Sequence, residues 1–235
     1  MKMPRPTPLL IAMSLSCLLV GCASTSTHQG DSSSDSPSSS PTISRMGTVG
    51  AVDFSRGYIS LGTGRTMVDL YIDPMCPYCR AFEESELPYL RRRIDRQEIT
   101  LRIHPTALLD RLSNGSAYST RASAAIADVA ASNPSKVLPF LSALYAAQPA
   151  ENSSGLTDGE LRDLEAKVGA SRTYTSDKTR NWVDQQTLMS THGPLQSTKE
   201  IHAIDHVPTV VVNGAVFPGD SGDVHGFQKF VQEHR

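Results

Sequence analysis

The chain has little excess charge, no long apolar run and no phosphate-binding motif. Each of these absences argues against one class of function. Its 235 residues carry a net charge of −2, so no strongly basic balance points to a nucleic-acid partner. An apolar run near the N-terminus has only about a dozen residues, whereas a membrane-spanning helix needs about 20. The G-x-G-x-x-G and P-loop patterns are missing, which leaves nucleotide binding without support.

The N-terminal segment is typical of an export signal. Two basic residues precede the apolar run of residues 9–20, and small residues follow it. The sequence LVGC at residues 19–22 resembles the lipobox of bacterial lipoproteins, in which the cysteine is acylated. We therefore expect a lipoprotein signal peptide over residues 1–21 and a lipid on Cys22. The mature protein would then be extracytoplasmic and anchored to a bacterial cell membrane.

The next segment predicts a tether. Residues 22–44, which start at the expected lipidated cysteine, are rich in Ser, Thr and Pro and contain almost nothing that could enter a core. Without a lipid on Cys22, the same segment would be an ordinary disordered tail. The folded domain is expected over residues 45–235, which is long enough for one domain with a sizeable core.

Cysteine is scarce, with four residues in the chain. Cys17 leaves with the signal peptide and Cys22 would carry lipid, so the folded domain keeps Cys76 and Cys79. A C-x-x-C pair can bind a metal, form a structural bridge, or act as a working dithiol. A bridge between them closes a very short loop and would constrain the unfolded chain little. The structural bridge is therefore the least favoured of the three.

Zinc is the main competing chemistry for the cysteine pair. His202 and His206, together with Cys76 and Cys79, have the ligand types and local spacings of a Cys₂His₂ site. However, more than a hundred residues separate the two pairs, where a zinc finger has about a dozen. We expect no metal.

Hydrophobic patterns predict a βαβ unit around the cysteines. A strand over residues 67–73 precedes the pair, a helix follows over residues 81–95, and a second strand covers residues 98–105. Such a unit usually brings its two strands into parallel pairing. Two short strands on either side of residues 55–57 are expected before it.

The remaining sequence is first helical and then returns to β structure. Residues from about 117 to 193 have helical periodicity, and Thr157 with Glu160 forms a plausible capping box. Asn213 and Gly214 predict a hairpin turn, after which the chain closes with a helix. The prediction is thus an α/β domain with an inserted helical subdomain.

Two motifs in this order of elements carry a family resemblance. CPYC at residues 76–79 and HVPTVVVNG at residues 206–214 resemble the DsbA-like members of the thioredoxin superfamily. The resemblance implies a thioredoxin fold with a helical insertion at about 117–193. It also implies an exported bacterial thiol-disulfide oxidoreductase that forms disulfides in exported proteins. A redox-active Cys76–Cys79 disulfide would replace any cofactor, and a membrane redox partner, a quinone-linked oxidase or an electron donor, would renew it.

Physical chemistry assigns roles within the dithiol. A cysteine at the exposed start of a helix has its thiolate stabilised by free backbone N–H groups, so Cys76 should be the nucleophile. Cys79 should be the shielded thiol that resolves the mixed disulfide. Pro77 and Tyr78 between them should tune the pair. DsbA itself has a histidine there and glutaredoxins have Pro-Tyr, so we expect weaker oxidising power than that of DsbA.

The resemblance also implies a substrate-binding loop. Pro208 should be cis and lie against the nucleophile, and Val207 and Thr209 should join it in binding an extended substrate chain. Many thioredoxin-fold enzymes carry a buried acid six residues before the first cysteine, but that position is Leu70 here. Asp69 should face the other side of the sheet.

Two other functions stay open at this point. The fold could serve a disulfide reductase or isomerase, because direction depends on the redox partner. It could also serve a non-catalytic module that binds polypeptide beside Val207 and uses its dithiol only as a redox sensor.

Overall fold

The computed structural model describes residues 47–170 and 177–235. The expected signal peptide, Cys22 and the Ser-rich tether lie outside the described residues, so they remain predictions. Within the described ranges, no helix is both long and apolar enough to span a bilayer.

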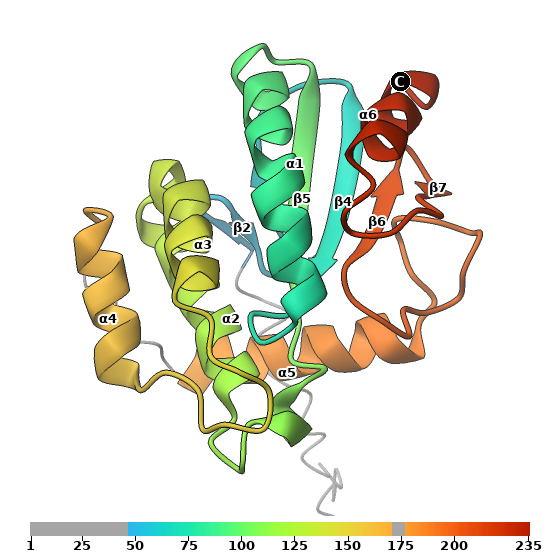
Figure 1. Ribbon diagram of the computed structural model, residues 1–235. Helices are drawn as coiled ribbons and strands as arrows, with labels where there is room; N and C mark the ends of the chain where they lie inside the picture. The colour runs from blue at the N-terminus through green and yellow to red at the C-terminus, as the bar shows by residue number, and fades with distance from the viewer. Residues whose placement is uncertain (1–46, 171–176) are drawn as a thin grey trace, which may run out of the picture. The chain divides into compact units, whose positions relative to one another are not determined.

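A seven-stranded mixed sheet forms the centre of the described domain (Figure 1). The strand order is β1-β2-β3-β5-β4-β6-β7. Only β4 and β5 are parallel among neighbouring strands of this sheet, as the predicted βαβ unit requires. The strands are β1 (Thr48–Val49), β2 (Val52–Asp53), β3 (Tyr58–Leu61), β4 (Thr66–Ile72), β5 (Ile99–Pro105), β6 (Thr209–Val212) and β7 (Ala215–Val216).

Six α-helices accompany the sheet in the described ranges. They are α1 (Pro77–Asp95), α2 (Tyr118–Ser132), α3 (Val137–Ala146), α4 (Asp158–Lys167), α5 (Asp177–His192) and α6 (Val224–Glu233), with short 3₁₀ turns at Asp110–Leu112 and Pro134–Lys136. Helix α1 connects β4 to β5, and α2 to α5 lie between β5 and β6 in the chain. The thioredoxin fold with a helical insertion is therefore confirmed.

The alternation of β4 sends its side chains to two different environments. Leu70 and Ile72 lie with Cys79 in the apolar layer beneath α1. Asp69 and Tyr71 lie on the opposite face of the sheet, beside the end of α5. This period of two, with buried residues on both faces, places the dithiol on one side of β4 and a polar cluster on the other.

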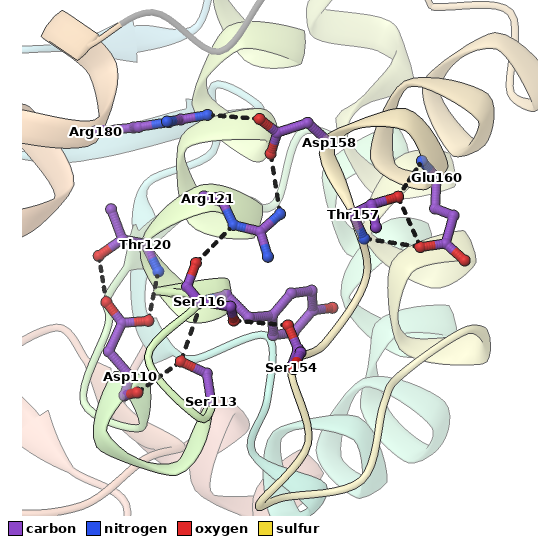
Figure 2. A network of polar contacts seen from close by, with 11 residues as sticks. Asp110, Ser113, Ser116, Thr120, Arg121, Ser154, Thr157, Asp158, Glu160 and Arg180 are labelled. Atoms are coloured by element: carbon purple, nitrogen blue, oxygen red, sulfur yellow. Dashed lines mark hydrogen bonds and ion pairs between the residues drawn. The ribbon is translucent and has the colours of Figure 1, made fainter.

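The inserted helices share one continuous apolar core with the sheet, and a polar network joins them to one another. Trp182, Tyr118 and Phe140 are fully buried, and the Trp182 indole donates to the carbonyl of Phe54 near the sheet. Figure 2 shows the network. In it, the Asp158 carboxylate at the start of α4 accepts from Arg121 of α2 and Arg180 of α5, each at 2.9 Å.

The predicted capping box of α4 is confirmed. The Thr157 hydroxyl accepts from the Glu160 backbone N–H, and the Glu160 carboxylate accepts from the Thr157 backbone N–H. These two reciprocal bonds satisfy donors that a helix start leaves free. The hairpin turn at Asn213 and Gly214 is also confirmed, and it joins β6 to β7.

Candidate active site

Cys76 lies where β4 has ended and α1 begins. It is the N-cap residue of α1, with extended backbone angles (φ −74°, ψ 118°), and Pro77 follows at the first helical position. Proline suits that position because the N–H it lacks would have no partner inside the helix. The Cys76 thiol is therefore held beside the positive end of the helix dipole.

The two thiols have pKa shifts of opposite sign. Both are free and buried, with Cys76 4% and Cys79 1% exposed. A hydrogen bond from the Cys79 thiol lowers the pKa of Cys76, assisted by the backbone N–H groups of Cys79 and Tyr78 and opposed by burial. Burial raises the pKa of Cys79, and its bond to Cys76 raises it further. Cys76 is thus the thiol that ionises first, in line with the predicted roles.

The expectation that Cys76 is exposed was wrong. Its Sγ lies 3.2 Å from the carbonyl oxygen of Val207 and donates a hydrogen bond to it. The loop before β6 therefore covers the sulfur. The cover comes from a residue 131 positions later in the chain, so the local helix-start pattern carried no signal of it. As a thiolate, Cys76 cannot donate this bond, and the Val207 carbonyl becomes available to another donor.

Asp73 is a buried acid that the sequence left without a role. Its carboxylate accepts from the backbone N–H of Met75 at 2.8 Å, from the hydroxyl of Ser119 at 2.7 Å, and from the backbone N–H of Leu109 at 2.8 Å. Its own backbone N–H lies 3.5 Å from the Sγ of Cys79. Burial raises the pKa of Asp73 to about 6, although the three donors oppose that shift. Asp73 can therefore exchange a proton near neutral pH.

The charge on Asp73 acts on both thiols. When ionised, Asp73 raises the pKa of Cys76 and of Cys79, because like charges disfavour one another. Thiolate formation and ionisation of Asp73 are thus linked, so that one disfavours the other. Asp73 is the nearest counterpart here of the buried acid that many thioredoxin-fold enzymes carry at the position of Leu70. Asp69 indeed faces the other side of the sheet, where its carboxylate lies 2.8 Å from the His104 ring.

The helical subdomain also holds the turn that carries the dithiol. Gln148, which follows α3, donates from its side-chain amide to the carbonyls of Pro74 and Cys76, each at 2.9 Å. The Tyr145 hydroxyl donates to the carbonyl of Asp73 at 3.3 Å. The backbone from Asp73 to Cys76 is therefore fixed from the side of the insertion.

A hollow of about 470 Å³ lies next to the cysteines, bounded by the start of α1 and the loop that enters β6. Its walls include Tyr78, Phe82, Val207, Pro208, Val210 and Phe217. The Val207–Pro208 peptide bond is cis, the geometry that the family resemblance implied. Tyr78 lines the hollow with a side chain that is 67% exposed.

Thr209 has a different position from its two neighbours. It is buried, begins β6, and donates from its hydroxyl to the carbonyl of His206 at 2.7 Å. Thr209 thus supports the loop internally, while Val207 and Pro208 line the hollow.

The four possible zinc ligands do not come together in the structure. Within the described ranges, no three or more His, Cys, Asp or Glu side chains form a cluster suited to a metal ion. His206 instead pairs with the neighbouring Asp205 on the exposed loop. His202 is exposed, and its backbone carbonyl accepts from Leu195.

A family model described as thioredoxin matches residues 63–233, which is most of the chain. The chain belongs to the thioredoxin family. Its predicted DsbA-like character is confirmed by solved structures of that group. The reduced disulfide bond oxidoreductase DsbG of Mycobacterium tuberculosis is 26% identical, with a TM-score of 0.52 over 72% of this chain and 77% of that one.

A solved structure at lower sequence identity also shares the fold. BdbD of Bacillus subtilis has a TM-score of 0.57 at 20% identity, over 76% of this chain and 92% of BdbD. Among curated proteins, the serine/threonine-protein kinase PknE of Mycobacterium tuberculosis is 35% identical over 123 residues. That stretch is 51% of this chain and 22% of the kinase, so the chain spans about a fifth of the length of these curated relatives.

Proposed function

We propose that the chain is a thiol-disulfide oxidoreductase that forms disulfide bonds in exported proteins. The observation that carries the proposal is the dithiol itself. Cys76, with a lowered pKa, and Cys79, with a raised one, lie at a helix start beside a hollow that is open to a substrate. This arrangement suits thiol-disulfide exchange, in which one sulfur leads and the other resolves.

The reaction proceeds by two exchanges of sulfur partners. In the oxidised enzyme, a substrate thiolate attacks Sγ of Cys76, the Cys76–Cys79 bond breaks, and Cys79 leaves and takes up a proton. A second substrate thiolate then attacks the substrate sulfur of the mixed disulfide, and Cys76 leaves as a thiolate. The substrate loses two electrons and gains a disulfide. The enzyme gains those electrons as a dithiol and passes them to a membrane redox partner, for which a quinone-linked oxidase is the chemical class proposed.

The electrostatics of Cys76 support the proposed oxidising direction. Whatever stabilises its thiolate also stabilises the reduced enzyme, which makes the disulfide form a better oxidant. Burial and the charge on Asp73 work against this stabilisation. We therefore expect a reduction potential close to the range of glutaredoxins, about −200 to −230 mV, and less oxidising than about −120 mV for DsbA.

The hollow beside Cys76 suits an extended segment of substrate. Val207 presents its backbone at the sulfur, and the walls of the hollow carry aromatic and aliphatic side chains. An extended chain can pair with a free backbone edge while its side chains enter such a hollow. The proposed substrates are therefore unfolded or partly folded exported chains that still expose a cysteine in extended backbone.

The proposed location is the outer face of a bacterial cell membrane, with the protein anchored by a lipid on Cys22. Its support is the LVGC sequence at the end of the apolar run. Metabolic labelling with a fatty acid should label the wild-type chain and the Cys17→Ser variant but not Cys22→Ser. A soluble mature chain without label would contradict the anchor and leave the redox chemistry untouched.

The redox function can be tested with a purified enzyme and a reduced, unfolded protein that contains disulfides in its native state. The wild type should accelerate recovery of native disulfides with glutathione disulfide as oxidant, and Cys76→Ser should abolish the acceleration. A potential near −270 mV, as for thioredoxin, would instead favour a reductase. Binding without any acceleration would favour a redox-sensing module.

A further inference from the structure

A second hollow, of about 270 Å³, lies on the face of the sheet opposite the dithiol. The sheet contributes Tyr58 from β3, Asp69 and Tyr71 from β4, and Arg102 and His104 from β5. The end of α5 and the loop of residues 194–197 form the opposite wall. Because β4 alternates, Tyr71 enters this hollow while Ile72 packs near Cys79. This hollow and the apolar layer around Cys79 are therefore both lined by residues of β4, but they have no lining residue in common.

The floor of this hollow is polar where a sheet under a helix is ordinarily apolar. Asp69 Oδ1 lies 2.8 Å from His104 Nε2. The His104 ring stacks on Tyr71, with ring centroids 4.1 Å apart, and Arg102 lies over the Tyr58 ring at 5.1 Å. Removing each of these polar groups from water costs free energy, so apolar side chains would pack against α5 at a lower cost.

Two arginines at the hollow have hydrogen-bonding capacity to spare. Arg102 approaches Asp69 Oδ1 only to 3.6 Å, longer than a hydrogen bond, and that oxygen already pairs with His104. No partner among the described residues binds Arg102 Nε. Arg56 at the mouth has a side chain that is 67% exposed, approaches Asp53 at 3.9 Å, and donates to the Tyr58 hydroxyl at 3.4 Å. A guanidinium offers five donors, so most remain available.

The charges that line the hollow favour an anion. Among the lining residues there are two guanidinium groups, those of Arg56 and Arg102, and one carboxylate, that of Asp69. Asp53 offsets Arg56 from outside the lining, at a distance that gives a weak pair. The apolar part of the wall comes from Met189, Leu195 and the tyrosine rings, which would contact carbon atoms.

We propose that this hollow binds a small organic anion through its carboxylate group, with Arg56 and Arg102 as the residues that hold it. A planar guanidinium matches a carboxylate with two parallel hydrogen bonds. The volume lies just below the range of about 300–1,000 Å³ for drug-sized ligands, so the ligand is of metabolite size. An inorganic ion would leave the aromatic and aliphatic wall without a partner.

The test is a titration of the purified full chain with sodium benzoate at constant ionic strength, balanced with sodium chloride and followed by NMR. Resonances of His104 and Tyr71 should shift and saturate. Arg56→Gln and Arg102→Gln should each raise the Kd at least fivefold, and Arg92→Gln, an exposed arginine of α1, should leave it unchanged. Arg56→Gln carries the test if Arg102→Gln fails to fold, because Arg56 is largely exposed.

Three results would overturn the proposal. They are shifts that do not saturate, an unchanged Kd in Arg56→Gln, and sulfate binding as tightly as benzoate. A variant with both Cys76 and Cys79 replaced by serine should bind benzoate as the wild type does. Loss of binding in that variant would contradict the placement of the site across the sheet from the dithiol. Failure of the oxidoreductase proposal would leave this one standing.

Discussion

The buried Asp73 carboxyl should make the stability of the protein depend on pH in a way that asparagine cannot reproduce. The pKa of Asp73 is about 6 in the folded chain, against 3.8 for the unperturbed group. Between these values the folded state binds more protons than the unfolded state, so the free energy of unfolding falls as pH rises from about 4 to 6. A shift of about two units corresponds to about 3 kcal/mol, which is lost as pH rises through about 6 and is fully absent by about pH 7.

Asparagine at position 73 would be uncharged throughout. In Asp73→Asn, the side-chain amide would face the Leu109 N–H, and this mismatch costs about 1–3 kcal/mol at every pH. The free energy of unfolding of the variant, minus that of its parent, should therefore rise by about 3 kcal/mol between pH 4 and pH 7. The mismatch changes this difference in free energy by the same amount at every pH, so it does not affect how the difference varies with pH.

Urea unfolding at several pH values would measure this difference. Parent and variant should both carry serine in place of Cys76 and Cys79, which removes thiol oxidation and titration from the comparison. Asp163→Asn, at an exposed position of α4, provides the matched control, and its difference curve should be flat. Parallel curves for Asp73→Asn and its parent would refute the claim that burial raises the pKa of Asp73.

Three further predictions concern the two thiols, the N-cap of α4 and bound zinc. Iodoacetamide should alkylate Cys76 at lower pH than Cys79. Cys79→Ala should slow the reaction at Cys76, because the donor that lowers the pKa of Cys76 is gone. If Cys79 in Cys76→Ala reacts faster than Cys76 in Cys79→Ala, the roles of the two thiols are reversed. Thr157→Ala should lower the free energy of unfolding by about 1 kcal/mol in urea, through loss of the N-cap; an unchanged midpoint would show that the cap adds nothing. Elemental analysis should find no zinc; one metal per chain that is lost in Cys76→Ala would restore the zinc alternative.

Local patterns in the sequence were sufficient for most of the fold. The alternation of residues 67–73 and 98–105 with a helix between them predicted the parallel pair of β4 and β5. Asn213 with Gly214 predicted the hairpin, and Thr157 with Glu160 predicted the start of α4. In each case the signal lies within a few residues of the feature it specifies, where chain geometry is set by local sterics and hydrogen bonding.

The chemical surroundings of the dithiol could not be predicted in the same way. The donors to Asp73 include Leu109 and Ser119, which lie 36 and 46 positions away, and Val207 covers Cys76 from 131 positions away. Their arrival depends on how the insertion and the last strands pack, which no local pattern records. For the same reason, the sequence predicted β3 as a short strand ahead of the βαβ unit without revealing its antiparallel pairing with β5.

The contacts of the insertion with the dithiol turn limit how modular this domain is. Ser119 binds the Asp73 carboxylate, Tyr145 binds the Asp73 carbonyl, and Gln148 binds the carbonyls on either side of Met75. Excision of residues 117–193, with the ends joined by a short linker, would remove all four bonds while leaving every strand of the sheet in place. The result would be a thioredoxin-like scaffold with a loosened active-site turn. A change in the length or sequence of this insertion would therefore also alter the contacts that hold the turn of the two thiols.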